Sequence, residues 1–158
     1  MTAGQVATSR CHDDRGQVGG IEALPFGLLI FVLGTLLIAN AWAVVDAKFA
    51  TDSAARQAAR TFVEGDDVDE ALADAVQAAR AAVAGHGRDP DRAQIRPVGS
   101  PRLVRCERVT FAVAYEVPAL SIPLIGGYGR APFTVRSTHS ELVDPFRSGL
   151  AGQAEDCV

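Results

Sequence analysis

Residues 23–45 read ALPFGLLIFVLGTLLIANAWAVV, and this run contains no charged residue. As an α-helix it would be about 34 Å long, which exceeds the roughly 30 Å hydrocarbon core of a bilayer. Inside lipid only a helix or a closed barrel satisfies its own backbone groups, and one segment cannot close a barrel. A buried core helix is the alternative, but such a helix carries a polar face and this run shows none. The sequence therefore predicts one transmembrane helix at residues 21–45.

The residues at the two ends of this run support a membrane span. Glu22 lies just inside the N-terminal end, where an acid either complements the helix macrodipole or pairs with a cation when helices pack together. Trp42 lies near the other end, where an indole suits the headgroup layer. Asp46 and Lys48 close the segment. Basic residues on the two sides are too evenly matched for the positive-inside rule to fix the orientation.

A cleaved secretory signal is a second interpretation of the same run. Residues 41–43 are Ala-Trp-Ala, which has the small-x-small form of a cleavage site. However, the run is much longer than the usual 7–15 residue apolar region, and the residues before it are hardly basic. A permanent anchor is the favoured interpretation, and release after Ala43 stays open.

Size and charge limit the function classes. The chain has 158 residues and a net charge of −4. Once the tail and the span are set aside, about a hundred residues remain, enough for one small domain. A nucleic-acid-binding surface would be basic, so we expect no nucleic-acid partner.

The three cysteines fall on both sides of the predicted span. Cys11 precedes it, while Cys106 and Cys157 follow it, so only these last two share a compartment. We expect them to form a disulfide outside the membrane, worth about 4 kcal/mol in the chain-entropy model. Two unrelated thiols are the alternative. No Cys-x-x-Cys cluster suggests a metal site, and none is predicted.

Helical periodicity continues past the membrane. Residues 46–64 are rich in Ala and lack Pro, so we expect the membrane helix to continue to Glu64 and to end at Gly65. A second helix is predicted from an N-cap at Asp67 to a stop at Gly85. The predicted apolar faces are Val45, Phe49, Ala55, Ala59, Phe62 and Val63 on the first helix, and Val68, Leu72, Val76, Ala79 and Val83 on the second.

The rest of the chain predicts β-structure. Residues 94–98 suggest a short strand weakened by Pro97, and residues 109–117 alternate clearly between apolar and polar. Residues 118–132 predict an apolar loop punctuated by Pro and Gly, and residues 133–141 predict a second long strand. The fold class is therefore α+β with a small antiparallel sheet of three or four strands. The predicted divisions are a cytoplasmic tail (1–20), a transmembrane helix (21–45), a helical part (46–85) and a β-rich extracytoplasmic part (86–158).

Motifs that could carry catalysis are weak. The sequence IGGYG at residues 125–129 precedes a strand, whereas phosphate-binding loops open a helix. His139 and Ser140 are neighbours on a strand and so lie on opposite faces. His86 with Asp89 and Asp91 could contact a cation, although a solvated loop is the simpler interpretation. We therefore predict no enzyme, no cofactor and no small-molecule substrate.

Residues 14–24 (DRGQVGGIEAL), the apolar run and residues 54–60 (AARQAAR) resemble the TadE-like family of the tight-adherence (Flp-type) pilus, in its actinobacterial form. Residues 118–129 and 138–145 resemble the C-terminal part of the same family. The resemblance implies a pilin-like domain on a membrane helix. It also implies a minor pilin or pseudopilin-like function in pilus assembly or secretion, with other pilin-like subunits and Tad/Flp inner-membrane proteins as partners. The N-terminus would lie inside the cytoplasmic membrane and the domain outside it.

The resemblance also assigns roles at the N-terminus. Glu22 would set subunit assembly by pairing with a neighbour's amine. Leader processing in such families follows a Gly and leaves Glu fifth, but a cut after Gly16 would leave Glu22 sixth. A cut between Gln17 and Val18 would leave it fifth, and an uncleaved form is the third possibility. An exported or anchored envelope binding domain unrelated to pili is the alternative function.

Overall fold

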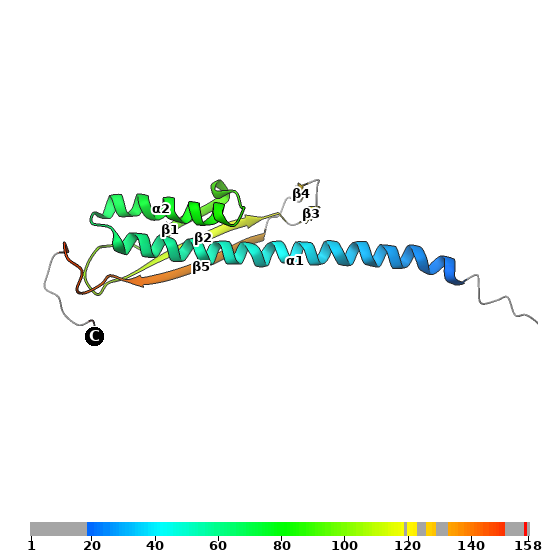
Figure 1. Cartoon of the computed structure of the whole chain (residues 1–158), viewed down its shortest axis with the longest axis horizontal. Coiled ribbons are helices and arrows are strands. Elements are labelled where there is room, and N and C mark those ends of the chain that lie inside the picture. Colours follow the sequence, from blue (N-terminus) through cyan, green and yellow to red (C-terminus); the bar gives the residue numbers. More distant parts are fainter. Residues whose placement is uncertain (1–18, 119, 123–125, 129–132, 151–156, 158) are drawn as a thin grey trace, which may run out of the picture. The chain divides into compact units, whose positions relative to one another are not determined.

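The computed structural model describes residues 19–118, 120–122, 126–128, 133–150 and 157. It divides into two compact units, Met1–Leu37 and Ile38–Val158, and the second holds every described strand. The fold class is α+β, as predicted (Figure 1). The elements in order are α1 (Gly19–Glu64), α2 (Val68–Gly85), the 3-10 turn η2 (Pro90–Arg92), β1 (Ala93–Pro97), β2 (Arg108–Val117), β3 (Leu120–Ile122), β4 (Gly126–Tyr128) and β5 (Phe133–Leu142).

The main sheet has three antiparallel strands in the order β1-β2-β5. Tyr115 on the central strand lies opposite Ala93 on one side and Val135 on the other. Pro97 falls at the end of an edge strand, where its missing N–H removes no ladder bond from the centre. The alternation predicted for β2 is confirmed, and the buried residues are Val109, Phe111, Val113, Tyr115 and Val117.

The segment predicted as a loop at residues 118–132 contains regular structure. Leu120–Ile122 and Gly126–Tyr128 pair as a small antiparallel sheet of their own. Strands of three residues are too short to show an alternating pattern, and Pro118 and Pro123 favoured a loop. The prediction of a plain loop was therefore wrong for these residues.

The predicted end of the first helix is confirmed, because α1 ends at Glu64. The N–H of Gly65 donates to the carbonyl of Phe62 at 3.1 Å. A Cβ added at Gly65 would lie 2.3 Å from Cβ of Ala71, closer than any real contact. Glycine is needed here because the start of α2 approaches this position directly.

The apolar face predicted for α1 was wrong at two positions. Val45 is 44% exposed and Phe49 is 62% exposed. Small side chains face the sheet instead, and they let the helix backbone come close to its neighbours. The fully buried residues of this row are Ala47, Ala50, Thr51, Ala54, Ala55, Ala58, Ala59 and Phe62.

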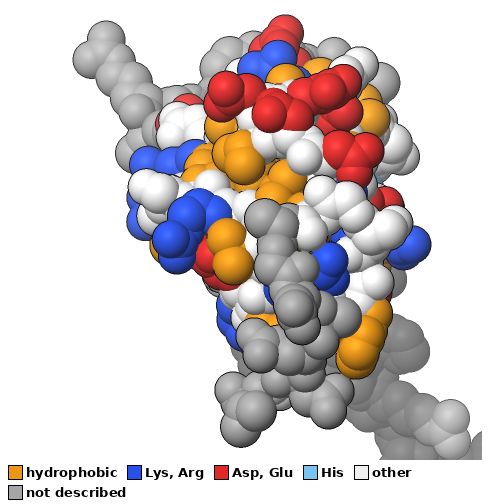
Figure 2. All heavy atoms as spheres, turned by 90° about the vertical axis from the view of Figure 1, so that its left-hand side faces the viewer, with side chains coloured by type: hydrophobic (Ala, Val, Ile, Leu, Met, Phe, Trp, Pro, Cys, Tyr) orange, Lys and Arg blue, Asp and Glu red, His pale blue; other side chains and the backbone are white. Residues whose placement is uncertain are grey.

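The second helix begins as predicted. The carboxylate of Asp67 accepts hydrogen bonds from the N–H groups of Asp69 and Glu70, at 2.9 and 3.1 Å. Acids in this first turn complement the helix dipole. Figure 2 shows acidic side chains gathered at this end of the domain, where α1 ends and α2 begins. The cap therefore accounts for part of the acidic surface.

The buried face of α2 differs from prediction, whereas its end at Gly85 is as predicted. The buried row is Ala71, Ala75, Ala79 and Val83, whereas Val68 is 36% exposed. The helix does end at Gly85, but the left-handed residue is Gly87, with φ 69°. Its N–H donates to the carbonyl of Ala84 at 2.8 Å and so closes the helix end.

Candidate functional site

The N-terminal part of α1 exposes a long apolar surface. Among the described residues, α1 is the one helix that is long and apolar enough to span a membrane. No residue in its most apolar stretch is buried. In water such a surface would be costly, at about 25 cal/mol for each Å² exposed. The exposed large side chains include Leu24, Phe26, Leu28, Ile30, Phe31, Leu37, Ile38 and Trp42, each more than 65% exposed.

Of the residues assigned to subunit assembly and leader processing, the structure describes only the position of Glu22. Glu22 lies in the first turn of α1, which begins at Gly19. Its position near the helix N-terminus agrees with the favourable dipole environment expected for an acid. Gly16, Gln17 and Val18, as well as Cys11, lie outside the described residues.

Arg88 ties the loop after α2 to the part of α1 that follows the apolar run. Its Nε donates to Oδ2 of Asp46 at 2.9 Å, and its NH2 donates to the carbonyl of Ala43 at 2.7 Å. The guanidinium also lies 5.4 Å from the ring centre of Tyr115. The side chain is only 15% exposed, so these contacts act in a partly desolvated environment. Arg88 therefore fixes α1 at the edge of the predicted span.

A polar cluster joins α1 to β5 one turn further on. Nζ of Lys48 donates to Oγ of Ser137 at 2.7 Å and to the carbonyl of Arg136 at 2.9 Å, and it pairs with Asp52 at 3.2 Å. Thr51 is fully buried, and its hydroxyl lies 2.7 Å from Oγ of Ser137. Hydrogen bonds from Ser137 and then from Lys48 lower the pKa of Asp52 below its usual value. The contacts of Lys48, Thr51 and Ser137 therefore tie α1 to β5.

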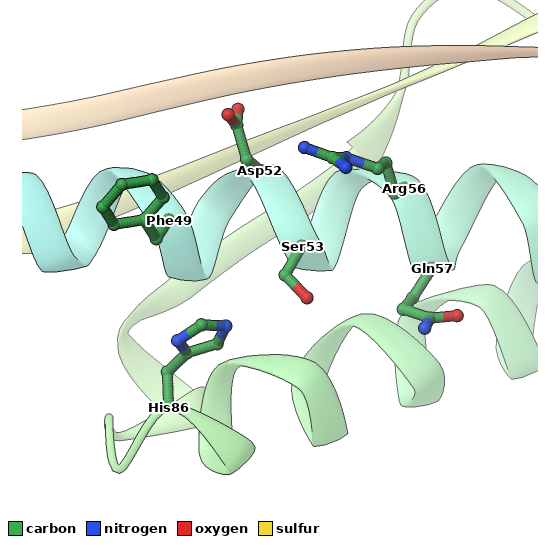
Figure 3. Close-up of a pocket in the computed structure, with 6 residues that line it drawn as sticks. All are labelled: Phe49, Asp52, Ser53, Arg56, Gln57 and His86. Carbon is green, nitrogen blue, oxygen red and sulfur yellow. The ribbon is translucent and has the colours of Figure 1, made fainter.

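Figure 3 shows a shallow depression of about 440 Å³ between α1 and the end of α2. Asp52 and Arg56 project from one side of α1, whereas Ser53 lies on the side that faces His86. These side chains do not converge on one point in the depression.

The other candidate catalytic residues have partners of their own. Nε2 of His139 lies 3.1 Å from Oε1 of Glu141, and Oγ of Ser140 lies 2.8 Å from Oγ1 of Thr110. His139 and Ser140 thus engage different neighbours on opposite faces of β5, as strand alternation predicts. Within the described part of the chain no group of three or more His, Cys, Asp or Glu residues could hold a metal ion.

The predicted cysteine pair is found at bonding distance. The sulfur atoms of Cys106 and Cys157 lie 2.01 Å apart and close a loop between residues separated by 51 positions. Arg105, beside Cys106, donates to the carbonyls of Pro145 and Leu150. The C-terminal segment, here residues 145–150 and Cys157, is therefore held to the connection before β2 by the disulfide and by the contacts of Arg105.

Arg147 holds the same segment to the end of α1. Its guanidinium donates to the carbonyls of Val63 and Glu64 and to the carboxylate of Asp66, the last at 2.7 Å. These are carbonyls that the last turn of a helix leaves without partners of its own. No pattern in the sequence points to Arg88, Arg105 or Arg147, because an arginine in a loop carries no periodic signal.

Comparison with known proteins gave no relative: no family model, no curated protein and no solved structure matches the chain.

Proposed function

We propose that this protein is a membrane-anchored, minor pilin or pseudopilin-like component of a Tad/Flp-type pilus assembly or secretion system. One observation supports the anchor above all. α1 is exposed and apolar along residues 23–38, yet the same unbroken helix provides the Ala-rich row that packs in the core from Ala47 to Phe62. In this proposal one helix contributes both the anchor and part of the domain core.

The pilus assignment comes from the TadE-like sequence resemblance. In this proposal the N-terminus is cytoplasmic and the α+β domain lies outside the membrane, where Cys106 and Cys157 can be oxidised. Glu22 pairs with a cation of a neighbouring pilin-like subunit within the membrane. A carboxylate that loses such a partner in a low dielectric is left as an unpaired charge, which costs several kcal/mol.

The anchor is tested by fractionation of cells that express the full chain. The protein should remain with membranes after a carbonate wash, and externally added protease should digest the domain. Recovery in the soluble fraction without residues 1–43 would show that the apolar run is a cleaved signal.

The pilus assignment is tested with Glu22→Gln, which preserves the shape of the side chain and removes its charge. The variant should insert and fold, but co-purify poorly with the pilin-like subunits and inner-membrane proteins of the same system. Asp46→Asn, which also removes one carboxylate at an end of the run, is the matched control and should co-purify normally. If Glu22→Gln co-purifies and assembles like the parent protein, Glu22 has no assembly role, and an anchored envelope domain unrelated to pili becomes the better explanation.

A further inference from the structure

The main sheet has one face that neither described helix covers. α1 and α2 pack against the face that carries the buried row of β2. Since residues alternate between faces along a strand, Thr110, Ala112 and Ala114 lie on the other face, and they are only partly buried. In the register of the sheet, Ala112 lies opposite Arg96 on β1, and Ala114 lies opposite Arg136 on β5. This open face therefore has small side chains along its centre and longer side chains on both sides.

The open face carries an ordered set of charges. Arg108 lies at the start of β2, and Arg96 and Arg136 flank the middle of the strand. Glu116 lies near the end of β2, and all four side chains are exposed. Within the described part of the chain, none of the three guanidinium groups has an ion-pair partner. Along the direction of β2 the open face therefore changes from basic to acidic, in the order Arg108, Arg96, Arg136 and Glu116.

The exposed side of α2 carries the opposite order of charge. Asp69 and Glu70 lie in its first turn, at the acidic end of the domain in Figure 2. Asp74 follows one turn later, and Arg80 follows about two turns after that. All four residues are exposed, and their side chains form no ion pair among the described residues. Along its own direction α2 therefore changes from acidic to basic.

α2 and β2 run in the same direction within one domain. β5 contacts Lys48 of α1, and the segment that follows β5 contacts Glu64, so β5 runs with α1. β2 is antiparallel to β5 and therefore runs against α1. α2 also runs against α1, because Arg88, just after the end of α2, contacts Ala43. Two copies in the same orientation therefore bring the two charge sequences together in complementary order when α2 of one lies along β2 of the other.

We infer that the open face of the main sheet binds the exposed side of α2 of a second copy of this chain, with both copies in the same orientation. Complementary charges across such a contact fix its orientation and exclude the reversed one. The contact is heterologous, so each pair keeps a free sheet face and a free α2 and further copies can be added. One helix on a small sheet covers less than the roughly 1,600 Å² of a standard interface, so we expect a weak contact. The inference goes beyond the proposed function and depends only on the domain, although a shared membrane would hold the copies in one orientation and raise their effective concentration.

The test measures energy transfer between donor-labelled and acceptor-labelled copies of the full chain, tagged at the N-terminus, in an excess of detergent micelles. Arg96→Glu reverses a charge on the open face, and Asp74→Lys reverses one on α2. Arg108→Glu with Glu70→Lys is a second pair of reversals, in case a variant of the first pair fails to fold. Arg56→Glu is the matched control, because Arg56 is exposed on α1 and lies on neither surface.

The parent protein should associate, and Arg96→Glu or Asp74→Lys alone should weaken association by about tenfold, because like charges then face each other. An equal mixture of these two variants should associate about as well as the parent, since every contact between unlike copies joins opposite charges again. Arg56→Glu should behave like the parent, and so should Glu22→Gln, which separates this contact from the assembly role proposed for Glu22.

Three results would overturn the inference. The first is a parent protein without energy transfer between copies. The second is association of both single variants at the strength of the parent. The third is a loss that mixing does not restore, or that Arg56→Glu or Glu22→Gln reproduces, because the association would then depend on other surfaces or on the anchor.

Discussion

Replacement of Arg88 by Gln tests whether α1 is fixed to the domain where the apolar run ends. The guanidinium donates to the carbonyl of Ala43 and to the carboxylate of Asp46, and it lies over the ring of Tyr115. A charge-assisted hydrogen bond contributes about 1.5–3 kcal/mol. The ion pair adds at most about 1 kcal/mol, because the Asp46 side chain is 41% exposed. The contact with the ring adds about 0.5–1 kcal/mol.

These contributions share one side chain, so they do not simply add, and we expect a loss of about 2–4 kcal/mol in the free energy of unfolding. The assay is urea unfolding of the full chain in mild detergent, followed by circular dichroism. The midpoint should fall by about 1–2 M urea with little change in slope.

Arg92→Gln is the matched control, because Arg92 lies 5.7 Å from the centre of the same ring but is exposed to solvent. Its loss should cost less than about 1 kcal/mol. Equal midpoints for the Arg88 and Arg92 variants would refute the assignment of Arg88 as a tie between the loop and α1.

Three further changes test other features. Gly65→Ala should destabilise the domain by about 1–3 kcal/mol, because its Cβ would clash with that of Ala71; urea midpoints check this, and a neutral effect would contradict the close approach. The lowered pKa of Asp52 means that its contribution to stability is present above the unfolded pKa of about 4 and is lost as the pH falls through the folded value. Asp52→Asn should therefore reduce the loss of stability between pH 5 and pH 2 in thermal melts, and parallel curves would refute this. Cys157→Ser should lower stability by up to about 4 kcal/mol, and a reducing agent should then have no further effect; a reductant-sensitive variant would contradict the pairing.

Large-scale features of the fold follow from strong local patterns. The apolar run, the Asp67 cap and the alternation of β2 each repeat one physical preference over many residues, so the sequence alone predicts them. The apolar faces of the helices were harder to predict. Periodicity predicts that large side chains such as Phe49 lie on the buried face of the helix. In the structure the buried positions are instead filled by alanines such as Ala54 and Ala58, which allow close packing.

The contacts that hold the domain together could not be predicted for a different reason. Arg88 and Asp46 are 42 positions apart, and Lys48 and Ser137 are 89 apart. Their pairing depends on the three-dimensional path of the chain, which no local pattern encodes. The cysteine pair was predictable only because the predicted membrane span separates Cys11 from the other two. The role of Glu22 stays a prediction, since it depends on neighbours outside this chain.

The contacts at the two ends of the packed part of α1 have a mechanical consequence. Arg88 and Lys48 hold this part of the helix where it enters the domain, and Arg147 holds it where it ends. The contacts of Arg136 with Lys48 and of Arg147 with Val63 and Glu64 show that β5 runs in the same direction as α1. In the proposed anchored protein, a pull on the N-terminal side of α1 would therefore load the helix–sheet contact in shear. In shear the ties bear load together and must break together, whereas in peeling they would break one after another. A pull along the packed part of α1 would therefore be resisted by Arg88, Lys48 and Arg147 together.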